Sequence, residues 1–189
     1  MGRFVPNLEH LYKWLLLGVK YTGRFLLGYL ADYHVPTPLV EGGKRGSPNF
    51  PRPWAIPLVT TAGALVAALL VAKFAPEATG HGTDSAIEAI HTDPRHIRLR
   101  VVLVKLISSA LVIGSGGSAG REGPTAQISA GFASLLTRRL HLSDDDGRIL
   151  VSLGVGAGIG AIFGAPLGGA VLAVGMMACF GSVAHAPLA

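Results

Sequence analysis

Long apolar stretches alternate along most of the chain with short polar stretches rich in glycine or proline. Their periodicity predicts helices over 54–74, 85–91, 97–113, 124–137, 144–162 and 165–180. Residues 55–72 and 149–189 contain no Asp, Glu, Lys or Arg, and each is long enough to supply a membrane-spanning helix of about 20 residues. The pattern therefore predicts an all-α, multi-pass membrane protein.

The first predicted helix, over 7–32, is amphipathic rather than uniformly apolar. Lys13, Lys20 and Arg24 share one face, opposite leucines that recur on a rough helical period. The segment is either an interfacial helix or part of a spanning helix. Residues 35–53 contain five prolines and three glycines, which predict an extramembrane loop and not a domain boundary. We interpret 1–189 as a single partial transmembrane domain.

A glycine-rich break over 114–124 interrupts the apolar pattern with five glycines, an arginine and a glutamate. Charged residues at membrane depth usually face a cavity or a pathway, and irregular backbone persists there only inside protein or along such a cavity. Pro124 suits the first turn of the helix that follows, and the predicted helix over 124–137 is too short to span by itself. We expect broken, half-penetrating helices that meet near the middle of the membrane.

Two further breaks share this character. The first is Gly80-His81-Gly82-Thr83-Asp84, in which Thr83 or Asp84 is the predicted N-cap of the short helix. A histidine between two glycines is typical of a surface loop, and no cluster of Cys or carboxylate residues accompanies it, so we predict no metal site. The second is Phe163-Gly164-Ala165-Pro166, which follows two overlapping small-xxx-small pairs over 154–160 that favour close helix packing in lipid.

Composition and charge support the membrane class and disfavour two others. Half of the residues are hydrophobic, 14% are charged, and the net charge is +5. The basic residues fall in short clusters at the edges of apolar stretches, which favours membrane-edge loops over a nucleic-acid surface. The glycine-rich break lacks the Gly-Lys-Ser/Thr ending of a P-loop and follows a helix rather than a strand. We predict no nucleic-acid partner, no cofactor and no enzyme activity.

The glycine-rich break is instead typical of an anion site. A helix that begins at membrane depth directs unpaired N–H groups and the positive end of its dipole toward whatever lies before it. Glu122 sits at such a start, where its carboxylate competes with a bound anion, and protonation of Glu122 would couple proton and anion. The other interpretation is a structural pair of Glu122 with Arg121, or a helix cap.

Gly120-Arg121-Glu122-Gly123-Pro124, after its Gly/Ser-rich turn, closely resembles the signature of the ClC chloride channels and chloride/proton antiporters. The later break, Phe163-Gly164-Ala165-Pro166, resembles a second motif of that family, and the resemblance covers about 54–174. It implies the first inverted repeat of a homodimeric fold with a pore in each subunit, and it implies that Glu122 is the gate. The anion-binding residues that it implies are Gly80, His81, Gly82, Gly120, Arg121, Gly123 and Pro124.

The chain departs from the family pattern at three places. His81 stands where the family often has an anion-contacting serine, so His81 is expected to line the anion path. Gly175 and Met176 stand where acidic residues would serve the inner proton route, which the sequence therefore does not support. The second repeat has no counterpart after Phe180, so we expect a truncated chain whose pore is incomplete by itself.

The resemblance implies a component of a chloride channel or chloride/proton antiporter in the lipid bilayer of the plasma membrane. Chloride is the expected ion, with protons as a second possible one. The alternative is a non-conducting membrane fragment that acts only through assembly with another subunit or a complementary half. The glycine face over 154–160 motivates this alternative.

Overall fold

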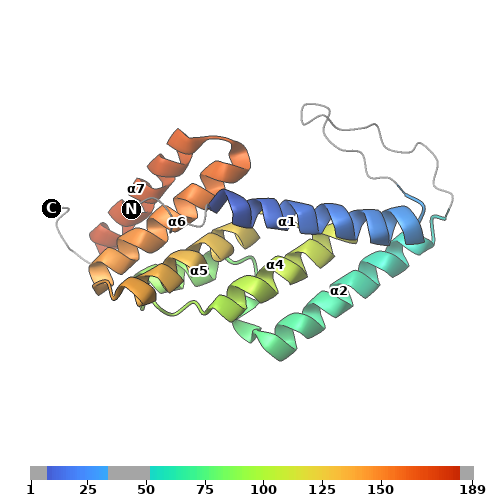
Figure 1. Ribbon diagram of the computed structural model, residues 1–189, viewed down its shortest axis with the longest axis horizontal. Coiled ribbons are helices and arrows are strands. Elements are labelled where there is room, and N and C mark those ends of the chain that lie inside the picture. The colour runs from blue at the N-terminus through green and yellow to red at the C-terminus, as the bar shows by residue number, and fades with distance from the viewer. Residues whose placement is uncertain (1–7, 34–51, 184–189) are drawn as a thin grey trace.

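A computed structural model describes residues 8–33 and 52–183 of the chain (Figure 1). Within these two ranges the backbone is helical and contains no strand, which confirms the predicted all-α class. The elements in chain order are α1 (Leu8–Gly23), a π-helical continuation η1 (Arg24–Leu30), α2 (Ala55–Phe74), a 3₁₀ turn η3 (Pro76–Ala78), α3 (Thr83–His91), α4 (Leu99–Gly114), α5 (Glu122–Leu140), α6 (Asp144–Phe163) and α7 (Pro166–Val183).

Helix α5 occupies the centre of the structure. It lies between α4 and α6 and also contacts α1 and α3 (Figure 1). All residues from Gly123 to Gly131 are buried, so the first half of this helix is enclosed by protein. An apolar cluster that includes Ala126, Ala130 and Val155 joins α5 to α3, α4 and α6. The helix start that carries Glu122 is therefore held by packing on several sides.

Glycines of α6 pack against both neighbouring helices, α5 and α7. Gly154 and Gly158 face α5, where an added Cβ would overlap Ser129. Gly156 and Gly160 face α7, where an added Cβ would crowd Gly169. The predicted close packing is therefore confirmed, because the small residues let backbones approach. All four glycines are buried within the chain, so the prediction of a glycine face available for assembly is wrong.

The helix bounds differ from the predicted ones most clearly in α5. Instead of 124–137 it runs from Glu122 to Leu140, 19 residues, because residues 122 and 123 already adopt helical backbone and Arg138 and Arg139 form its last turn. At about 1.5 Å per residue this is roughly 28 Å, longer than a half-penetrating segment. His141 then ends it with a left-handed φ of 52°.

The N-cap of α3 also differs from the prediction. The helix begins at Thr83 rather than at 85, and its N-cap is Gly82 instead of Thr83 or Asp84. Gly82 has a φ of 108°, a conformation that side chains other than hydrogen rarely allow. At α6 the N-cap is Ser143, whose hydroxyl accepts a hydrogen bond from the Asp146 N–H at 3.1 Å.

The remaining bounds move by up to three residues. α2 begins at Ala55 rather than 54, α4 covers 99–114 rather than 97–113, and α6 and α7 end later than the predicted 162 and 180. The predicted helix over 7–32 divides into α1 and η1. The predicted loop over 35–53 lies outside the described residues, except for its last two.

Two described helices, α2 and α6, are long and apolar enough to cross a membrane by length and composition. In α2 only Ala55, Gly63 and Ala67 are buried, so most of its apolar surface faces outward. α6 is more enclosed, because α5 and α7 pack on it. The outward face of α2 is compatible with contact to lipid.

The glycine contacts of α6 give a stability prediction. Gly158→Ala should lower the free energy of unfolding by about 1–3 kcal/mol, because the new methyl group would overlap the Ser129 side chain. Gly175→Ala on α7, where no atom lies within 4 Å of the added methyl group, should instead raise it by up to about 1 kcal/mol. Denaturant unfolding of the detergent-solubilised chain measures both, and equal effects would contradict the tight α5–α6 contact.

Candidate functional site

Two of the three predicted breaks meet at the start of α5. The turn Gly80-His81-Gly82 lies directly against Gly123, where an added Cβ would overlap both the imidazole ring and the carbonyl oxygen of His81. A Cβ on Gly82 would come within 2.8 Å of the Gly123 carbonyl oxygen. Glycine at both positions therefore permits the contact, which joins segments about forty residues apart in the sequence.

Glu122 is the first residue of α5, and its side chain folds back toward the glycine-rich segment before the helix. One carboxylate oxygen lies so close to Gly120 that an added Cβ there would overlap it. Glu122 and Arg121 are half-buried, whereas Gly120 is exposed. Pro124 is buried as the third residue of the helix, in the first turn, where its missing N–H leaves no hydrogen bond unmade. The carboxylate thus lies at the positive end of the helix dipole.

Lys105 on α4 anchors the turn Gly80-His81-Gly82, called the His81 turn below, through hydrogen bonds to backbone carbonyl oxygens. Its ammonium group donates to the Gly80 carbonyl oxygen at 2.7 Å and to the Ala78 carbonyl oxygen at 3.1 Å. Only 5% of Lys105 is exposed. Lys105 ends a basic cluster over 95–105, and such clusters were predicted to lie at membrane edges; for Lys105 this prediction is wrong, because its side chain is buried and points inward. An isolated lysine within an apolar helix was the available signal.

Gln127 is a second buried residue at this contact. It is fully buried, one turn after Gly123, and its amide nitrogen donates to the Glu77 carbonyl oxygen at 3.3 Å. A Cβ on Gly82 would come within 2.9 Å of the Gln127 side-chain oxygen. Gln127 thereby ties α5 to the η3 turn. Nothing in its local sequence distinguished it from a packing residue of the helix.

His81 lies at the exposed rim of this arrangement. Its ring nitrogen Nδ1 is 3.4 Å from the Thr83 hydroxyl oxygen, and its ring covers Gly123. The residue is exposed, as expected for a surface loop, yet it also lies beside the start of α5. The N-terminus of α5 thus lies beside an exposed imidazole, and the buried Lys105 ammonium group holds the turn that carries this imidazole. Such an arrangement favours a small anion.

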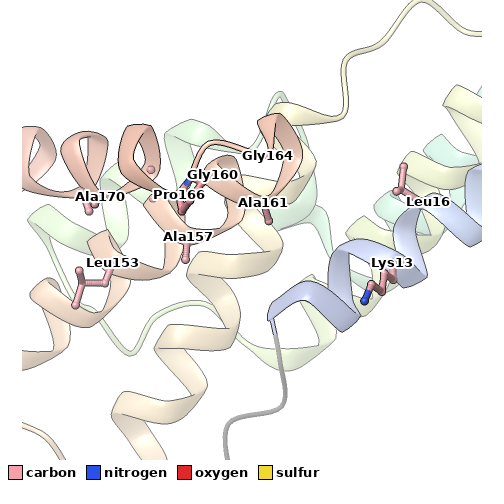
Figure 2. A pocket seen from close by; sticks show the side chains of 12 residues that line it. Lys13, Leu16, Leu153, Ala157, Gly160, Ala161, Gly164, Pro166 and Ala170 are labelled. Carbon is pink, nitrogen blue, oxygen red and sulfur yellow. The ribbon is translucent and has the colours of Figure 1, made fainter. Parts of the chain in front are cut away.

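The third break lies apart from this contact. Phe163, Gly164, Ala165 and Pro166 are exposed at the turn between α6 and α7. Gly164 and Pro166 line a groove of about 760 Å³, which contains no residue of α5 or of 114–121. Figure 2 shows Lys13 and Leu16 of α1 on one side of this groove and the α6–α7 turn on the other. The structure therefore does not unite all three predicted breaks.

Comparison with known proteins gives a consistent family match. The family described as voltage gated chloride channel matches residues 63–174. An uncharacterized protein of Methanocaldococcus jannaschii is 41% identical over 97 residues, which cover 51% of this chain and 24% of that protein.

Two relatives carry functional names. The H(+)/Cl(-) exchange transporter ClcA of Vibrio vulnificus strain YJ016 is 39% identical over 119 residues, which cover 62% of this chain and 25% of the transporter. The chloride/fluoride channel protein of Pseudomonas syringae pv. tomato is 34% identical over 130 residues, covering 66% of this chain and 28% of that channel. The chain thus spans about a quarter of the length of these curated relatives.

The anchoring role of Lys105 can be tested by stability. Lys105→Met keeps an unbranched side chain but leaves the carbonyl oxygens of buried Ala78 and exposed Gly80 without this donor, and an unsatisfied buried carbonyl costs about 1–3 kcal/mol. We expect the free energy of unfolding to fall by about 2 kcal/mol or more. Lys73→Met is the matched control, because Lys73 is exposed and its replacement should change stability by less than about 0.5 kcal/mol. Thermal melts in detergent that gave both variants the same midpoint would contradict the anchor.

Proposed function

This chain belongs to the voltage-gated chloride channel family, and on that premise we propose that it takes part in moving chloride across a membrane, with Glu122 as the gate. The observation that carries the proposal is the contact between the His81 turn and Gly123. It brings a glycine-flanked turn to the start of a buried helix that also carries a carboxylate. The function is transport rather than catalysis.

The gate works by competition for one positive site. The Glu122 carboxylate lies over Gly120 at the start of α5, where the helix dipole favours a negative charge. A chloride ion is favoured at the same place, and the two negative charges repel each other. Protonation or displacement of the carboxylate therefore admits the anion. Gly120 and Arg121 shape the site from the segment before α5, and Gly123 and Pro124 shape it from the first turn of α5.

Lys105 supplies the positive charge beneath the His81 turn. Its ammonium group is buried and is fixed by the Gly80 and Ala78 carbonyl oxygens. A charge held in a low-dielectric interior acts over a longer range than a charge in water. His81 and Gly120 are exposed in the described part of the chain, so groups beyond those residues complete the coordination of the anion. The pore is accordingly incomplete in this part of the protein.

The same proposal extends to the assembly and its location. The relatives include an exchange transporter and a channel, so protons are a second candidate ion, coupled through Glu122. We place the protein as a homodimer in the plasma membrane, on the strength of its family resemblance. The alternative, a non-conducting fragment acting through its glycine face, loses its structural motivation because those glycines are buried against α5 and α7.

Chloride binding tests the gate. Glu122→Gln removes the competing charge at nearly constant shape, so chloride should bind about tenfold more tightly at neutral pH, the equivalent of about 1.4 kcal/mol. The wild-type affinity, measured at the same pH, is the reference for this comparison. Titration of the lipid-embedded chain with chloride measures both.

Glu88→Gln is the control for the gate, because Glu88 is exposed on α3 and makes the same charge change away from the site. Its chloride affinity should match that of the wild type. The gate assignment fails if Glu122→Gln and Glu88→Gln behave alike. Chloride flux in liposomes that Glu122→Gln left unchanged would equally contradict it.

The contact between the two breaks can be tested separately. Gly123→Ala would drive a methyl group into the His81 ring and carbonyl oxygen, and relieving such an overlap costs about 1–3 kcal/mol. We expect chloride to bind about tenfold more weakly, because the His81 turn must move away from α5. Gly175→Ala, which meets open space, should leave chloride affinity unchanged. Unaltered binding by Gly123→Ala would show that the contact does not shape the site.

A further inference from the structure

A second hollow lies on the outward face shared by α2 and α4, away from the anion site. It has a volume of about 430 Å³. Its lining includes Leu70, Phe74, Leu99, Arg100, Leu103 and Ile107. Large apolar side chains form almost the whole surface, and several stay substantially exposed, with 47% for Phe74, 53% for Leu103 and 50% for Ile107. The groove is therefore lined by apolar side chains and is open to the surroundings of the protein.

Positive charge is concentrated at one end of this groove. Arg100 lines the groove and is exposed in the first turn of α4. Lys73 does not line the groove itself, but its ammonium group lies 5.8 Å from the centre of the ring of Phe74, which does. Arg98, beside them, is already paired with Glu77. The N-terminus of α4 also lies at this end, and its Arg98 N-cap makes no side-chain capping hydrogen bond. Two cations and a helix N-terminus all favour a negatively charged group.

A positive charge in the first turn of a helix is repelled by the positive end of the helix dipole, so the position of Arg100 in α4 is electrostatically unfavourable. A ligand that carries negative charge at this end would offset that repulsion. The groove extends from Arg100 to Ile107 along α4, about 10 Å at 1.5 Å per residue. An apolar stretch of this length beneath a cationic end matches an acyl chain below a phosphate group.

The lining also distinguishes lipid from a packed helix. Helix contacts within this chain use small residues: Gly18 meets Ala110 across α1 and α4, and Gly63 meets Ser115 across α2 and α4. Such residues let backbones approach closely in a membrane. The groove instead presents branched and aromatic side chains, which keep a second helix backbone farther from the groove than small residues would. A flexible chain fills it better.

We propose that this groove binds one acyl chain of an anionic phospholipid, with the lipid phosphate held by Arg100 and Lys73 at the N-terminus of α4. The site is separate from the Glu122 contact and does not depend on chloride transport. It requires only that the α2–α4 face meets lipid, as the outward apolar surface of α2 indicates. Electrostatic attraction of basic residues to anionic lipid and burial of apolar surface act together there.

Lipid cross-linking tests the proposal. The full chain is placed in nanodiscs of phosphatidylcholine with a minority of phosphatidylglycerol that carries a photoactivatable acyl chain. Cross-linked peptides from α2 and α4 are then quantified by mass spectrometry. We expect labelling of the groove by phosphatidylglycerol, and Arg100→Gln should reduce it about fivefold, the effect of one basic residue near an anionic surface. Phosphatidylcholine that carries the same photoactivatable acyl chain should label the groove poorly.

Arg139→Gln is the matched control, since Arg139 is exposed in the last turn of α5 and does not line the groove. It should leave the labelling unchanged. Ile107→Trp, which fills the apolar end, should abolish acyl-chain labelling while Arg100 is intact. The proposal is overturned if Arg100→Gln and Arg139→Gln reduce labelling equally. It is also overturned if Leu103 cross-links to a second polypeptide instead of to lipid.

Discussion

The close approach of the His81 turn to the start of α5 is the constraint on which the rest of the candidate site depends. Any side chain at Gly123 would collide with His81, and any side chain at Gly82 would collide with α5. Lys105 fixes the same turn by donating to the Gly80 carbonyl oxygen, and it also holds the Ala78 carbonyl oxygen at the end of η3. If the turn moved away, Glu122 would still begin a helix, but the His81 turn would no longer lie beside that helix start.

Packing of small residues holds α5 in place around this contact. α6 uses alternate glycines for α5 and for α7, so each of its two buried sides accepts a neighbouring backbone. On the other side, α4 meets α5, and its own small residues admit α1 and α2. Because contacts of this kind have few alternative arrangements, the position of the Glu122 helix start is set by the helices around it.

Charged side chains divide into two groups with different tasks. Among the described residues, several basic side chains lie in loops or at helix ends, where Arg95 pairs with Asp144 at 2.5 Å and Arg98 pairs with Glu77. These exposed pairs tie loops together and contribute little stability each. Lys105 is instead buried in the middle of α4, where an unbalanced charge is costly, and Glu122 is half-buried as the first residue of α5. The Lys105 charge is thus held by the turn that packs against the start of α5.

The sequence by itself determined the helical class, the positions of the breaks and the presence of Glu122 near the start of a helix. These features follow from glycine, proline and apolar periodicity, which act locally. It could not determine which breaks meet. Contacts between 80–82 and 123 depend on the angles of α3, α4 and α5, and those angles arise from packing over long sequence separations. For the same reason, only the tertiary structure decided that the Lys105 side chain points inward. No local pattern specifies that the glycines of α6 pack against both α5 and α7.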